Sequence, residues 1–129
     1  MKYNYICLVG IIPTTVFGYL WKSKIMLFVS LVGYIFHTNP HNKVIKFMDL
    51  SINVSLTLYA TVIEKKTRIP ATFSGICYAY NNILHRPNNI NGIVYNLKHV
   101  FFIQIVGVYG YYLLYNHEPC LEFFFICDN

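Results

Sequence analysis

The sequence predicts an all-α protein, a polytopic integral membrane bundle of about five short transmembrane helices that forms one domain over residues 1–129. Apolar residues make up 56% of the 129 residues, and charged residues only 12%. Soluble domains average about 45–50% apolar and about 25% charged residues. So few charges cannot cover a soluble surface of this size, and disordered chains are rich in charge and poor in aromatics. A hydrocarbon environment is therefore predicted.

Five apolar runs are separated by short polar segments. The expected helices cover residues 4–20, 25–37, 44–63, 69–84 and 99–115. The second run is shorter than the roughly 20 residues that cross a hydrocarbon core. Lys22 and Lys24 are expected to extend it by reaching toward the headgroups. A partial hairpin over residues 4–36 is the alternative, and two short spans are favoured.

Local signals mark the ends of these helices. Pro13 predicts a kink in the first helix, and Trp21 marks its interfacial end. Pro70 stands in the first turn of the fourth helix, where proline is favoured. The asparagine-rich residues 88–96 are expected to form a loop. The tail, residues 116–129, has an apolar stretch too short to span, and we expect it on the membrane surface or against the bundle.

Small residues are expected at close helix contacts. Gly107 and Gly110 predict a smooth face on the fifth helix for a neighbouring helix. Cys7 and Cys77 lie inside apolar runs and are interpreted as packing residues. The other two cysteines lie in the tail, where no spacing motif demands a disulfide.

The net charge of +5 comes from ten Lys and Arg residues against five Asp and Glu residues. The basic residues stand singly or in short clusters between the apolar runs, as membrane-flanking charges do. No basic stripe with interleaved aromatics is present, so the lipid bilayer is the expected partner and nucleic acid is not. Five spans would put five basic residues at each end of the bundle, which leaves the orientation undecided.

Alternating spans would bring four of the five histidines to the N-terminal end of the bundle. These are His37, His41, His85 and His99. Asp49 would lie at the same end, and ionisable groups in hydrocarbon usually face a bundle interior, a partner or a metal. Lys46, one turn before Asp49, offers a simple pairing explanation for this carboxylate.

Imidazole nitrogens and a carboxylate are usual zinc ligands, and a catalytic zinc site keeps one position open for water. Their convergence therefore makes a zinc site a hypothesis. Each histidine taken alone is better explained as an interfacial residue at a helix end. The hypothesis depends on the joint placement, since the chain has no strict zinc motif such as HExxH.

Two stretches place a histidine near a helix end. Residues 33–38 (GYIFHT) are followed by Asp49, twelve residues after His37. Residues 95–99 (YNLKH) run on into a helix that contains Gly107. These stretches resemble the second-to-third helix region and the last helix of the alkaline ceramidases, which belong to the CREST group of membrane hydrolases.

That resemblance implies a zinc ion held by His37, His99 and a third imidazole. It also implies that Asp49 acts as the base that orients a metal-activated water. The implied substrate is a lipid amide or ester that enters from the bilayer.

The chain departs from the family pattern in three ways. Tyr95 replaces the first histidine of the family's HxxxH pair, so His85 or His41 would supply the third imidazole, with His85 our candidate. Gly33 replaces the family's serine, and Ser30, one turn deeper, offers a hydroxyl for catalysis. The family has seven helices, and about five are expected here.

Two other functions remain open from the sequence. A small accessory or structural multi-pass protein, of the kind that large viruses encode, would act through helix contacts and need no catalysis. A homo-oligomeric pore would line a water path with the polar stripe Asp49, Asn53 and Thr57. That stripe thins beyond Thr57, which favours a one-sided pocket over a channel. Other enzyme classes lack support, because the chain has no P-loop, GxGxxG or GxSxG motif.

Overall fold

The computed structural model describes residues 4–85, 92–122 and 124–127. This part of the chain is helical and contains no strand, so the all-α prediction is confirmed. The elements, in chain order, are α1 (Tyr5–Leu20), α2 (Lys24–Thr38), α3 (Lys43–Ile63), η1 (Lys65–Thr67), α4 (Arg68–Tyr78), η2 (Ala79–Leu84), α5 (Ile93–His99), η3 (Val100–Gln104) and α6 (Ile105–His117). The segments η2 and η3 are π-helical and continue α4 and α5 without a break, so five helices result.

The first four helices begin and end within one residue of their predicted bounds. The fifth begins at Ile93, six residues before the predicted residue 99. The loop prediction is therefore wrong for residues 93–96, and its residues 88–91 lie outside the described part of the chain. The reason is tertiary: Asn96 is buried and its Oδ1 accepts a hydrogen bond from Nδ2 of Asn4 at 2.8 Å. That contact outweighs the weak helix propensity of asparagine.

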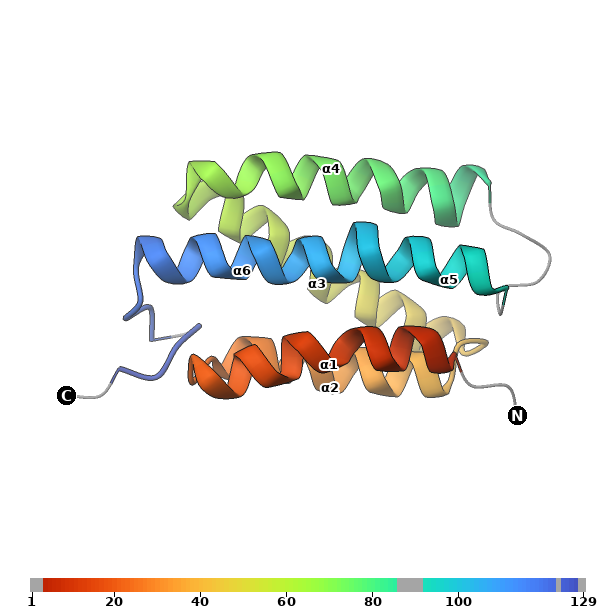
Figure 1. Ribbon diagram of the computed structural model, residues 1–129, viewed down its shortest axis with the longest axis horizontal. Helices are drawn as coiled ribbons and strands as arrows, with labels where there is room; N and C mark the ends of the chain where they lie inside the picture. The colour runs from red at the N-terminus through yellow and green to blue at the C-terminus, as the bar shows by residue number, and fades with distance from the viewer. Residues whose placement is uncertain (1–3, 86–91, 123, 128–129) are drawn as a thin grey trace.

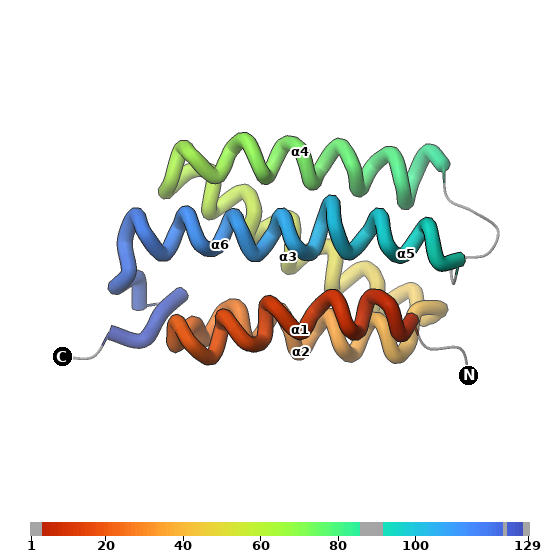
Figure 2. Tube along the Cα trace, in the orientation of Figure 1, coloured from red at the N-terminus to blue at the C-terminus, as the bar shows by residue number. Residues whose placement is uncertain are grey.

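The five helices lie in a compact bundle (Figure 1). The continuous helix α5–η3–α6 runs between α1 and α4, with α2 beside α1 and α3 crossing obliquely behind. Successive helices alternate in direction, as the tube in Figure 2 shows. The starts of α1 and α5 and the α2–α3 turn therefore share one end, the N-terminal end of the bundle. The α1–α2 and α3–α4 turns and the end of α6 share the C-terminal end.

Gly18 and Gly33 allow close contacts between α1 and α2. The glycines predicted to make close helix contacts, Gly107 and Gly110, do not make them among the described residues. A Cβ added at Gly33 would lie 3.0 Å from Cδ1 of Ile11, and one at Gly18 would lie 3.0 Å from Cβ of Met26. Nothing lies within 4 Å of a Cβ added at Gly107 or Gly110. The predicted packing face on the fifth helix is therefore wrong for contacts within the described chain.

The tail packs against the bundle, one of its two expected placements. Phe124 and Phe125 are buried with Ile25 and Leu114 in the main apolar core. The backbone amide of Ile126 donates to the carbonyl of Lys22 at 2.9 Å. Burial of two phenylalanine rings anchors the tail over the C-terminal end.

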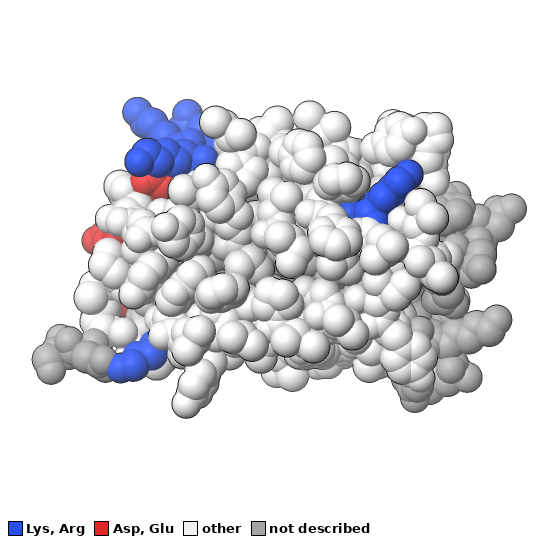
Figure 3. Space-filling view, viewed as in Figure 1, with Lys and Arg blue, Asp and Glu red and all other residues white. Residues whose placement is uncertain are grey.

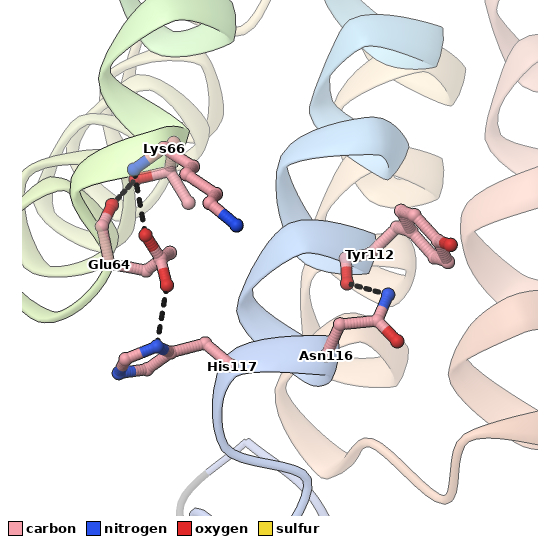
Figure 4. Close-up of polar contacts among 6 residues, drawn as sticks. Glu64, Lys66, Tyr112, Asn116 and His117 are labelled. Atoms are coloured by element: carbon pink, nitrogen blue, oxygen red, sulfur yellow. Dashed lines mark hydrogen bonds and ion pairs between the residues drawn. The ribbon is translucent and has the colours of Figure 1, made fainter.

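Glu64 joins the α3–α4 turn to the end of α6 at the same end of the bundle (Figure 4). Its Oε2 lies 2.6 Å from Nδ1 of His117, and its Oε1 accepts from the backbone amide of Lys66 at 2.8 Å. The hydroxyl of Thr67 donates to the Glu64 carbonyl at 2.7 Å. The first two contacts pair both carboxylate oxygens of a residue that is only 8% exposed.

One helix of the described chain, Ile93–His117, is long and apolar enough to cross a membrane, with 25 residues and a mean hydropathy of 1.3. Helices α1 and α2 are apolar but shorter. Large apolar side chains are exposed on all five helices. Examples are Tyr19, Leu31, Phe47, Ile69, Ile83 and Phe101. Figure 3 shows a face that is largely uncharged in its middle, with Lys and Arg side chains gathered at the C-terminal end and a further basic side chain toward the N-terminal end.

Candidate metal centre

Cys7, His37 and His99 form a group at the N-terminal end of the bundle. Their ligand atoms, Sγ and one ring nitrogen from each histidine, all lie within 4.8 Å of one another. The two imidazole rings meet edge to face, with centroids 5.5 Å apart. Zinc bonds of about 2.0–2.3 Å place tetrahedral ligand atoms about 3.5 Å apart. Shifts of about an ångström would therefore close the three side chains around an ion.

Three helix ends are tied together by a buried asparagine pair. Asn4 caps α1 by accepting from the backbone amide of Cys7 at 3.3 Å. Its own backbone amide donates to the carbonyl of His37 at 3.1 Å, which joins α1 to the end of α2. Asn96 of α5 accepts from Asn4 and also lies 3.5 Å from the Cys7 thiol, which donates to it. The backbone of α1 at Cys7 is therefore joined to the end of α2 at His37, which keeps the two side chains near each other.

Both π-helical segments flank this group. The segment η3 begins directly after His99, and η2 ends α4 at the same end of the bundle. Asn82 of η2 accepts a hydrogen bond from the Tyr95 hydroxyl, and Asn81 donates to the Tyr95 carbonyl at 3.3 Å. Tyr95 therefore binds the neighbouring helix. Single π-helical turns are rare and occur often at functional sites.

A cavity of about 50 Å³ lies against the group. Its lining includes Cys7, Phe36, His37, Asp49, Tyr78 and His99. One water needs roughly 10–15 Å³ of such space, so a few waters fit. The Asp49 carboxylate accepts from Nδ2 of Asn53 at 3.1 Å. A carboxylate, two imidazoles and a thiol therefore border one small polar space.

The structure brings together three of the five residues proposed from the sequence. His37 and His99 belong to the group, and Asp49 lines the cavity beside it. The third place in the group belongs to Cys7, which the sequence analysis interpreted as a packing residue. The alternating direction of the helices, which predicts that His37 and His99 lie at the N-terminal end, also predicts that Cys7 lies there. The position of Cys7 near these histidines could therefore have been predicted from the sequence.

The other two proposed residues lie elsewhere. His85 is exposed, and its ring packs at a tilt against Tyr80, with centroids 4.3 Å apart. Ser30 is buried, and its hydroxyl donates to the carbonyl of Met26 at 2.8 Å. Neither residue lines the cavity or belongs to the metal-ligating group. Ser30 instead satisfies its hydroxyl within its own helix.

The donor set fits a zinc ion. A thiolate and imidazoles are among the ligands that zinc takes in structural and catalytic sites. Nδ1 of His37 is buried and has no hydrogen-bond partner in the described part of the chain. Buried polar atoms are nearly always paired, so an unpaired ring nitrogen beside two other donor atoms is expected where a ligand binds.

Comparisons with protein-family models, curated proteins and solved structures find no match for this chain. The resemblance to the alkaline ceramidases therefore rests on the stretches around His37 and His99.

Proposed function

We propose that the protein is a multi-pass integral membrane enzyme that holds one zinc ion at Cys7, His37 and His99 and hydrolyses a lipid amide or ester. One observation carries the proposal: the Asp49 carboxylate lines the same cavity as the three donor side chains. An open space beside three ligands distinguishes a catalytic from a closed structural site.

The multi-pass arrangement is supported by the surface of the bundle. Exposed apolar side chains on all five helices would be unfavourable in water over so large an area. Helices α1 and α2 have 16 and 15 residues, or about 22–24 Å of length. The shortfall against a hydrocarbon core of about 30 Å is met by local thinning and by lysines that reach the headgroups. Lys22 and Lys24 stand at the shared end of these two helices.

Zinc at this site would supply a Lewis acid and an activated water. The chain contributes the remaining groups. Asp49 is placed to accept a proton from a water in the cavity and to return it to the departing amine or alcohol. Asn53 keeps that carboxylate oriented. Phe36 and Tyr78 supply aromatic side chains to the cavity lining.

The depth of the site suits a lipid substrate. Asp49 lies six residues after Lys43, the first residue of α3, which is about 9 Å along the helix. Lipid amides and esters carry their reactive carbonyl at a similar depth, between the headgroup and the acyl chains. The substrate would therefore reach the site from the bilayer without leaving it.

Hydrolysis is tested by incubating the zinc-loaded protein in mixed micelles with a ceramide or with a monoacylglycerol and measuring the fatty acid released. We expect release that stops when a chelator removes the metal and returns when zinc is restored. The His85→Ala variant should behave as the wild type, because His85 lies outside the site. Stoichiometric zinc with no release from either lipid would refute the hydrolase and favour a non-catalytic membrane protein.

A further inference from the structure

Gln104 is a half-buried polar residue that the proposed hydrolysis does not use. It ends the π-helical segment η3, one to two turns beyond His99. Its Nε2 donates to the carbonyl of Cys7 at 3.2 Å and lies 3.4 Å from Nε2 of His37. Its Oε1 is buried and has no partner among the described residues. One amide therefore touches two of the three members of the metal-ligating group.

Gly10 makes room for this amide. A Cβ added at Gly10 would lie 2.0 Å from Oε1 of Gln104 and 2.6 Å from Cγ2 of Val100. Either distance is shorter than real contacts allow, so a larger residue at position 10 would displace the Gln104 amide and the Val100 side chain. Glycine at this position therefore leaves the space that the Gln104 amide occupies.

Two side-chain atoms of these residues are buried without a hydrogen-bond partner among the described residues: Nδ1 of His37 and Oε1 of Gln104. A neutral imidazole carries its proton on one nitrogen and a free lone pair on the other. A histidine that binds a metal through one nitrogen usually donates the proton of its other nitrogen to a fixed acceptor. Nε2 of His37 already faces the Gln104 amide. A half-turn of that amide exchanges its nitrogen and oxygen and presents an acceptor.

We propose that Gln104 is a positioning residue for the metal site. When His37 binds the metal through Nδ1, its Nε2–H donates to the Gln104 amide oxygen, which fixes the tautomer and the orientation of the ring. Both unpaired atoms then gain partners. The Gln104 amide nitrogen then no longer donates to the Cys7 carbonyl. That carbonyl lies within α1 and accepts a hydrogen bond of the helix backbone. This inference rests on the proposed zinc site and adds Gln104 as the residue that orients one of the zinc ligands.

Two substitutions at Gln104 distinguish the effect of its hydrogen bond on zinc affinity from the effect of its side-chain volume. Gln104→Met keeps a similar volume without an acceptor, whereas Gln104→Glu keeps an acceptor oxygen. Zinc affinity is measured by competition with a chromophoric chelator, beside the visible spectrum of the cobalt-loaded protein. We expect Gln104→Met to bind zinc about 10–100-fold more weakly, the usual effect of losing such a partner. Gln104→Glu should restore most of the affinity.

Gly10→Ala is the second test, because it displaces the amide while Gln104 stays in the sequence. It should weaken zinc binding in the same direction, whereas Gly107→Ala, at an open position, should not. Thermal unfolding of each metal-free variant in detergent checks that the bundle remains folded.

Wild-type affinity in folded Gln104→Met would overturn the inference and leave the zinc site standing. Equal weakening by Gln104→Met and Gln104→Glu would also overturn it, since packing alone would then explain the effect. Wild-type protein that binds no zinc would overturn this inference and the proposed function together, so the two failures are distinguishable.

Discussion

The Cys7→Ser variant is expected to lose the thiolate-to-metal absorption band of the cobalt-loaded protein and to bind zinc more than about 100-fold more weakly. The expected loss exceeds the usual effect of removing an outer partner of a ligand, because a direct donor is removed. Serine keeps the size of the side chain, but its hydroxyl is a much poorer ligand for zinc than a thiolate. Absorption titration with cobalt, followed by competition with zinc, measures both effects.

Cys77→Ser is the matched control. Cys77 lies in α4 and does not belong to the metal-ligating group, so its variant should keep the band and the affinity. A cobalt-loaded Cys7→Ser protein with an unchanged near-ultraviolet spectrum would show that sulfur is not a ligand. The third donor would then have to be sought elsewhere.

The second large effect is expected for Asp49→Asn. This change keeps the shape and the contact with Asn53 but removes the proton acceptor. Loss of a general base typically lowers the rate about 10²–10⁴-fold. We therefore expect fatty acid release to fall by that factor while the zinc content stays at the wild-type level. Initial rates and metal content of the same preparation provide the measurement.

Ser30→Ala is the control for the catalytic assignment. The Ser30 hydroxyl bonds to the carbonyl of Met26 and lies outside the cavity lining, so activity should persist. If Asp49→Asn also lost its zinc, the carboxylate would act on the metal site itself. If it kept full activity, Asp49 would not be the base.

The helices could be predicted from the sequence because their signals are local. Apolar runs end at charged or proline-containing turns, and side-chain caps such as Ser23 mark where helices begin. The start of the fifth helix was missed because asparagine-rich sequence is typical of loops, and the buried contact of Asn96 with Asn4 cannot be predicted from local sequence. The Gly107 face was misassigned because a glycine pattern does not reveal which side of a helix has a neighbour.

The candidate site could be predicted in part. The convergence of His37, His99 and Asp49 follows from alternating helices alone, which is topology and needs no side-chain detail. Cys7 was missed because the sequence does not distinguish a cysteine that packs in an apolar run from one that binds a metal. His85 was misplaced because sequence gives the end of a helix but not the direction in which its last side chain points.

The zinc content of detergent-purified protein tests the central claim most directly. The proposed site predicts about one zinc per chain in the wild type and in His85→Ala, and background levels in His37→Ala and His99→Ala. Well-folded wild-type protein that contains no zinc, even after zinc is supplied, would contradict the metal site and the hydrolase built on it.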